Sequence, residues 1–176
     1  MLRSHKMLVF AGLLLFCLTF TSGVEARQKG ASNQGAPLSA QDKQHILQDN
    51  FVLVKTVQAV PQGVQHNLIG KDIGDGMADA GQPFERTDYV IGKPLPFQRL
   101  IFAGTSAGYC LVYNECGGFG YRTEVSLYHL VLGKATLVWR ADLQNSSIVF
   151  DLPQLRNEIV AGRFYSEQLP AAKVSH

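Results

Sequence analysis

A serine stands in a pattern that some hydrolases use for their nucleophile. Ser106 is the middle residue of the segment 104–108, GTSAG, which matches the G-x-S-x-G nucleophile elbow of α/β-hydrolases. In that elbow a helix follows the serine directly, because the serine sits on a sharp strand-to-helix turn. Here the residues that follow are aromatic and β-branched, which predicts a strand. We therefore interpret the pattern as a tight turn between strands.

Glu115 and His129 are a second pair of residue types that could do acid–base chemistry. Alternation along strands is expected to point them to opposite faces of a sheet, which argues against a shared site. A small exported hydrolase that uses Ser106, or a Glu115/His129 acid–base group, is therefore the alternative function and not the leading one.

Metal ligands are not indicated by the spacing of the acids and histidines. Asp72, Asp75 and Asp79 suggest calcium, but they do not have the alternating acids and the twelfth-position glutamate of an EF-hand loop. The histidines show none of the paired spacings typical of zinc sites. The sequence therefore predicts no metal ion and no cofactor.

Cys110 lies in the predicted strand 109–115, and Cys116 lies at the turn that follows it. The extended chain between them spans about 20 Å, whereas the α-carbons of a disulfide lie roughly 4.4–6.8 Å apart. We therefore expect no disulfide, with both cysteines unpaired.

The strongest candidate for a binding surface is one face of a predicted sheet. It carries Tyr113, Glu115, Arg122, Tyr128 and Trp139. Aromatic side chains with a polar group, set among charges on a rigid sheet, are enriched at binding surfaces. The expected ligand is a protein, a peptide or a carbohydrate. The alternative is that a terminal helix packs on this face and buries it.

A run of antiparallel strands between residues 99 and 143 would position these side chains. Glycine-marked turns divide it into strands at 99–103, 109–115, 121–132 and 135–140, with 148–150 as the candidate fifth strand. The expected pairing joins the following residues into a core face opposite the binding face: Cys110, Val112, Asn114, Thr123, Val125, Leu127 and His129.

Helix signals lie on both sides of this run. Ser39, with Asp42 three residues later, predicts the start of a helix about ten residues long. A strand at 51–57 and a short helix from Pro61 to Leu68 are expected to follow. Asp151 is expected to cap a last helix. The fold class is therefore α+β, an antiparallel meander of four to five strands with an N-terminal and a C-terminal helix packed on it.

The N-terminus has the three parts of a secretory signal peptide. Basic Arg3 and Lys6 precede the apolar run 7–20, and a polar stretch ends in the tripeptide 24–26, VEA. The apolar run is shorter than the about 20 residues that span a bilayer. We expect cleavage near Ala26, a secreted or periplasmic location, and no stable membrane anchor after cleavage.

The expected domain organisation is a signal peptide at 1–26, a disordered leader at 27–38, a single domain at 39–165 and a flexible tail at 166–176. A glycine- and aspartate-rich loop is expected at 70–98. Nucleic acid is excluded as a partner, because the formal net charge is only +2 and the basic residues are scattered singly. The leading interpretation is an exported small globular protein that acts as a non-catalytic binding or interaction module.

Overall fold

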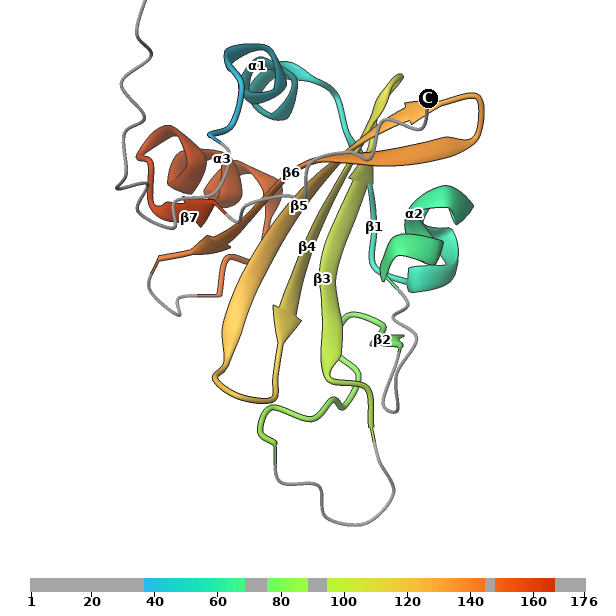
Figure 1. The fold of residues 1–176 in the computed structure, drawn as a ribbon, viewed down its shortest axis with the longest axis vertical. Helices are drawn as coiled ribbons and strands as arrows, with labels where there is room; N and C mark the ends of the chain where they lie inside the picture. The colour runs from blue at the N-terminus through green and yellow to red at the C-terminus, as the bar shows by residue number, and fades with distance from the viewer. Residues whose placement is uncertain (1–36, 69–75, 89–94, 145–147, 167–176) are drawn as a thin grey trace, which may run out of the picture. The chain divides into compact units, whose positions relative to one another are not determined.

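A mostly antiparallel sheet organises the protein (Figure 1). The computed structural model describes residues 37–68, 76–88, 95–144 and 148–166, all within the unit Ser32–His176. These residues form one sheet of seven strands. The first six, in spatial order, are β1 (Val52–Val54), β3 (Gln98–Thr105), β4 (Tyr109–Cys116), β5 (Arg122–Val131), β6 (Lys134–Leu143) and β7 (Phe164–Ser166). The seventh, β2 (Met77–Ala78), pairs with β3 in the parallel direction. The α+β class with an antiparallel sheet is confirmed.

Three α-helices and one 3-10 helix accompany the sheet in the described residues: α1 (Ala40–Gln48), α2 (Gln62–Leu68), α3 (Leu152–Val160) and η1 (Val57–Ala59). Local capping bonds start two of them as the sequence predicts. The Ser39 side chain accepts from the amide of Asp42 at 3.0 Å, and the Asp151 side chain accepts from the amide of Gln154 at 2.8 Å. Across the described segments, no helix has both the length and the apolar character that crossing a membrane requires.

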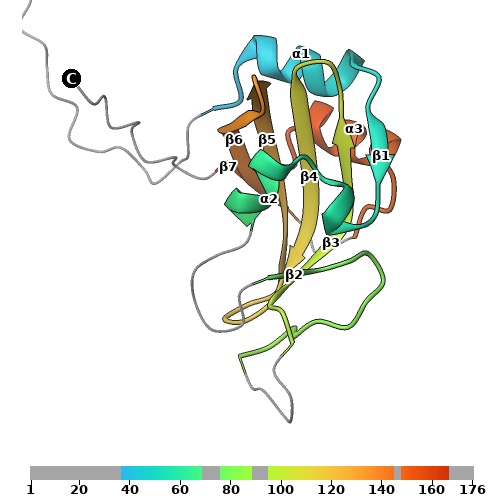
Figure 2. The ribbon, with the colours of Figure 1, turned by 90° about the vertical axis from the view of Figure 1, so that its right-hand side faces the viewer.

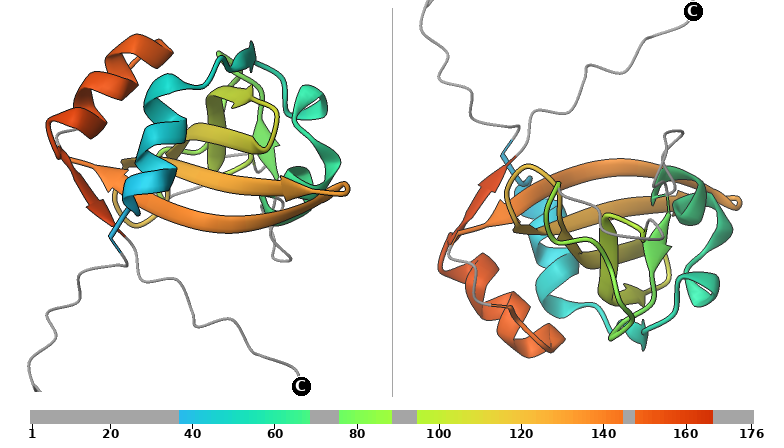
Figure 3. Two further views of the ribbon diagram at one scale, coloured as in Figure 1. Left: turned by 90° about the horizontal axis from the view of Figure 1, so that it is seen from above. Right: turned by 90° about the horizontal axis from the view of Figure 1, so that it is seen from below.

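Both faces of the sheet are covered. On one face, Ile46 of α1 and Ile159 of α3 join a buried cluster with residues of β3 to β6. On the other face, Val64 of α2 joins a second buried cluster around Val112. Figures 2 and 3 show α2 on the opposite side of the sheet from α3, with α1 on the α3 side. Every residue of β4 is buried as a result.

The pairing of β4 with β5 differs from the expected one. Cys116 pairs with Arg122, so five loop residues separate the strands. Because this number is odd, even-numbered residues of β4 pair with even-numbered residues of β5. The predicted core face is therefore wrong, because Thr123, Val125, Leu127 and His129 lie with the odd-numbered residues of β4 and not with Cys110, Val112 and Asn114.

The last part of the chain also departs from the expected elements. Residues 148–150 form no strand. Instead, the amide of Val149 donates to the hydroxyl of Tyr113 at 3.3 Å. Residue 166, expected to begin the tail, belongs to β7, where Ser166 pairs with Ala141. The β5–β6 turn consists of Leu132 and Gly133, both with positive φ, and not of the expected residues 133 and 134.

Gly117, directly after β4, allows a close approach of two backbone segments. Its amide donates to the carbonyl of Phe97 at 2.8 Å. A Cβ added at Gly117 would lie 1.8 Å from the carbonyl oxygen of Glu85 and 2.9 Å from the Cα of Arg86. Only glycine therefore lets the segment before β3 lie against the end of β4.

We expect Gly117→Ala to destabilise the protein by about 1–3 kcal/mol, because the new methyl group forces backbone apart in a packed region. The free energy of unfolding, measured in urea, checks this. Gly108→Ala is the matched control, because no heavy atom lies within 4 Å of a Cβ added there. Equal stability of the two variants would contradict the close approach.

Candidate functional site

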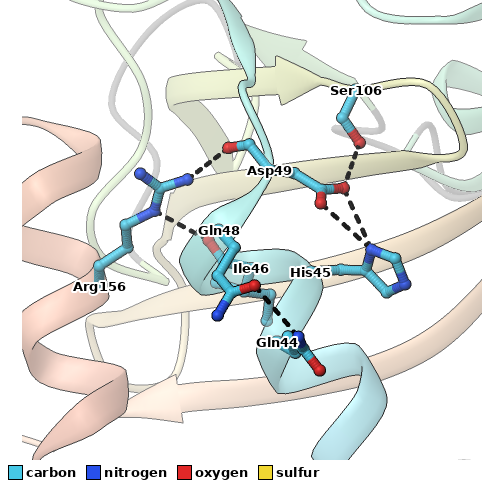
Figure 4. Close-up of polar contacts among 7 residues, drawn as sticks. All are labelled: Gln44, His45, Ile46, Gln48, Asp49, Ser106 and Arg156. Carbon is cyan, nitrogen blue, oxygen red and sulfur yellow. Dashed lines mark hydrogen bonds and ion pairs between the residues drawn. The ribbon is translucent and has the colours of Figure 1, made fainter.

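One polar cluster lies where the end of α1 meets the turn between β3 and β4 (Figure 4). Asp49 is the residue that caps the C-terminal end of α1. Its Oδ2 accepts a hydrogen bond from the Ser106 hydroxyl at 2.9 Å. Its Oδ1 lies 3.2 Å from Nδ1 of His45, one helical turn earlier. The carboxylate of Asp49 is therefore the centre of the cluster.

Arg156 of α3 holds the end of α1 in place from the other side (Figure 4). Its Nε donates to the carbonyl oxygen of Ile46 at 2.8 Å, and its Nη2 donates to that of Asp49 at 2.6 Å. The last carbonyls of a helix have no partner within the helix and carry partial negative charge. A guanidinium therefore satisfies them and fixes where Asp49 lies.

A shallow groove of about 520 Å³ opens beside this cluster, lined by His45, Asp49, Asn50, Ser106 and Tyr109 among others. The Tyr109 ring stacks on His45, with 4.2 Å between ring centroids, and lies 5.1 Å from the ring of His129. Burial raises the pKa of Tyr109, and the nearby carboxylates of Asp42 and Asp49 raise it further.

The order of hydrogen bonds in this cluster differs from that of a catalytic triad. In a Ser-His-Asp triad the histidine lies between the other two groups and takes the serine proton. Here Asp49 lies between Ser106 and His45. The serine hydroxyl donates to a carboxylate, and His45 contacts Asp49 and the ring of Tyr109. The arrangement can tie a hairpin to a helix, but it does not activate Ser106 through a histidine.

The five residues predicted to form a binding face do not share one face. Tyr113, Glu115 and Trp139 lie on the α3 side of the sheet, while Arg122 and Tyr128 lie on the α2 side. The prediction of a common face is therefore wrong. The error arises from the β4–β5 register, which differs from the expected one. Any ligand-binding role of these residues stays a prediction.

The three aromatic residues of that set are core side chains. Tyr113 and Tyr128 are 0% exposed and Trp139 is 2% exposed. The indole Nε1 of Trp139 donates to the hydroxyl of Ser166 at 3.1 Å, and its ring packs edge-on against Phe164. Tyr113 and Trp139 share a buried cluster with Ile159 of α3. For these two residues, the alternative that a terminal helix buries the face is therefore correct.

Glu115 and His129 lie on the same face and not on opposite faces, because Glu115 pairs with Thr123 and Tyr109 pairs with His129. They lie at opposite ends of the β4–β5 ladder, about 20 Å apart at 3.3 Å per residue. They therefore do not form the acid–base pair.

Glu115 is instead the centre of a buried ion pair. Its Oε2 accepts from Nε of Arg99 at 2.6 Å, and its Oε1 accepts from the hydroxyl of Tyr121 at 2.7 Å. Nη1 of Arg99 also donates to the carbonyl oxygen of Gln82 at 3.1 Å, and its guanidinium lies over the ring of Phe84. Burial, followed by the hydrogen bond to Glu115, raises the pKa of Tyr121 well above its usual range. The network fastens two loops to the sheet.

A second hollow, of about 350 Å³, lies beside this ion pair and is lined by Lys55, Gly81, Arg99, Ile101, Glu115 and Phe150 among others. The β3–β4 pairing is irregular between Leu100 and Phe102, which is a β-bulge. Bulges re-aim side chains and are common next to functional sites. We call this hollow the bulge cavity. The sequence singled out only Glu115 among its residues.

The acids that suggested calcium and the two cysteines form no metal site or disulfide in the described residues. Asp79 Oδ1 accepts from the amide of Val57 at 2.7 Å, whereas Asp72 and Asp75 lie outside the described residues, as do residues 145–147. Within residues 37–68, 76–88, 95–144 and 148–166, no cluster of acids, histidines and cysteines could hold a metal ion. Cys110 and Cys116 have free, buried thiols. Burial raises the pKa of Cys110 to about 11 and that of Cys116 to about 12.

Replacing Tyr121 tests the buried ion pair. Tyr121→Phe removes one donor from a carboxylate that is 2% exposed, so we expect a loss of about 1–3 kcal/mol in the free energy of unfolding. Tyr165→Phe is the control, because Tyr165 is exposed.

The stabilisation by Tyr121 also depends on pH, because its pKa is raised in the folded protein. Its contribution to the free energy of unfolding is complete below about pH 10, where unfolded tyrosine is neutral, and is lost as the pH rises further. The stability difference between wild type and Tyr121→Phe should therefore narrow above that pH, and a constant difference would contradict the hydrogen bond.

No protein-family model, curated protein or solved structure matches this chain. The case for a function therefore comes from the chain's own residues and from the two hollows that they line.

Proposed function

We propose that this is an exported, non-catalytic binding protein that receives its ligand in the bulge cavity. The observation that carries the proposal is the mixed lining of that cavity. It combines the charged side chains of Lys55 and Arg99 with the apolar side chains of Ile101 and Phe150. Ligand sites in proteins are typically concave and mostly apolar, with a few polar groups that orient the ligand.

The exposure of Phe150 supports a binding role. Its side chain is 71% exposed although it lies at the edge of a hollow next to the hydrophobic core. A large aromatic residue that borders a hollow loses its contact with water when a ligand fills the hollow. The bulge cavity thereby takes the place of the predicted aromatic face as the proposed binding surface.

The candidate catalytic groups are held in hydrogen bonds within the protein, which supports a non-catalytic role. Ser106 donates to Asp49, and Glu115 accepts from Arg99 and Tyr121. A nucleophile needs a neighbouring base, and a general base needs access to the proton that it takes. The export part of the proposal rests on the N-terminal residues 1–26, which lie outside the described residues.

A small hydrolase that uses the groove at Asp49 is the second candidate function. One observation favours it: His45, Asp49 and Ser106 come together from two distant segments at the side of a groove. The hydrogen-bond order argues against it, since a carboxylate and not an imidazole accepts the hydrogen bond from the serine hydroxyl.

A fragment titration followed by NMR tests the leading proposal. We expect saturable binders to shift the amide signals of Gly81, Ile101 and Phe150. Phe150→Ala should weaken binding about tenfold, because burying a phenylalanine side chain contributes about 1.5–3 kcal/mol. Phe119→Ala is the matched control, since Phe119 is 97% exposed and lies in the β4–β5 turn. Binders that shift only signals outside the cavity, or equal effects of the two variants, would contradict the proposal.

An esterase assay with activated aryl esters separates the two candidates. For a binding protein we expect no turnover above the uncatalysed rate, in wild type and in Ser106→Ala alike. Asn50→Ala serves as the control. Asn50 lines the same groove, but among the described contacts its side chain makes no hydrogen bond to the Asp49 carboxylate. Turnover that Ser106→Ala abolishes and Asn50→Ala retains would establish the hydrolase.

A further inference from the structure

We propose that the bulge cavity binds a carboxylate that is attached to an apolar body, with Lys55 pairing with the carboxylate. This inference rests on the proposed binding function, since it names the ligand class of the same cavity.

Three charged side chains line the cavity: Lys55, Arg99 and Glu115. Both carboxylate oxygens of Glu115 already accept hydrogen bonds, Oε2 from Arg99 and Oε1 from Tyr121. The charges of Arg99 and Glu115 therefore compensate each other. Lys55 is exposed, and among the described residues its ammonium group has no carboxylate within 4.0 Å. Counted over the described residues, the cavity thus carries one uncompensated positive charge.

Arg99 can add a second contact to an anion. Its guanidinium has five N–H groups. It directs Nε and Nη2 to Glu115 and donates from Nη1 to the carbonyl of Gln82. In the described part of the chain these contacts use three N–H groups and leave two for a further acceptor. Arginine and lysine beside each other suit a carboxylate, which accepts several hydrogen bonds at once.

The apolar part of the ligand would contact the other side of the cavity. Leu100, Ile101, Ile148 and Phe150 all line it. The bulge lies between Leu100 and Phe102, so it includes Ile101. A purely ionic ligand, such as inorganic phosphate, would leave the partly exposed side chains of Ile101, Ile148 and Phe150 in contact with water. The combination of one positive charge with apolar residues therefore favours an organic carboxylate.

Two kinds of ligand carry a carboxylate on an apolar body. One is a free organic acid, and the other is a peptide whose C-terminal residue has an apolar side chain. Isothermal titration of the full chain at low ionic strength compares them, with octanoate and N-acetyl-leucyl-phenylalanine as probes. Each probe is paired with its neutral amide. We expect each acid to bind about tenfold more tightly than its amide, because hydrogen bonds to a charged group are stronger than those to a neutral one. A response to one probe only identifies the source.

The variants assign the effect to the cavity. Lys55→Gln should reduce the preference for acid over amide, whereas Lys134→Gln, at an exposed lysine in β6 outside the cavity, should preserve it. The Lys55 side chain is exposed, so the variant is expected to fold, and circular dichroism checks this. Phe150→Ala should weaken the binding of acid and amide alike, whereas Phe119→Ala should weaken neither.

Three results would overturn the inference: equal binding of acid and amide, an unchanged preference in Lys55→Gln, or no saturable binding of either acid. Tighter binding of octylamine than of octanoate, lost in Phe150→Ala, would show that the cavity binds ligands of the opposite charge. That result would refute the carboxylate and leave the proposed binding function standing. The fragment titration tests the proposed binding function separately, because it makes no assumption about the charge of the ligand.

Discussion

The burial of β4 on both faces is the constraint on which the rest of the structure depends. All eight of its residues are buried, so each face of the sheet needs a cover. Helices α1 and α3 contribute to the cluster on one face, and η1, α2 and their neighbours contribute to the other. The polar residues of β4 must then find partners inside the protein. Glu115 does so through Arg99 and Tyr121, and the Asn114 side-chain amide lies 3.2 Å from the Cys116 sulfur.

Local interactions are the part of the fold that the sequence predicts well. The caps at Ser39 and Asp151 depend on residues three positions away. The glycine-marked turn expected between 115 and 121 is present, and its Gly118 and Gly120 have positive φ. The β4–β5 register was not predicted correctly, for a physical reason. A strand with one buried face shows which side chains point inward, but β4 is buried on both faces and so carries no such signal.

The candidate sites were harder to predict because they join distant parts of the chain. Ser106 and Asp49 are 57 positions apart, and Arg156 and Ile46 are 110 apart. Lys55 and Phe150 likewise come from opposite ends of the domain. Only the His45–Asp49 pair has a local signal, the spacing of one helical turn. The aromatic residues that looked like a binding surface were core residues, since Tyr and Trp serve in both environments.

The bond between Arg156 and the end of α1 has a consequence for the order of folding. The carbonyls of Ile46 and Asp49 receive their donors only when α3, the last helix, is in place. Contacts between such distant residues form late, because the intervening chain must be ordered first. A chain synthesised from its N-terminus therefore leaves α1 without this cap until residue 156 has emerged. The first helix of the described residues is therefore among the last to be completed.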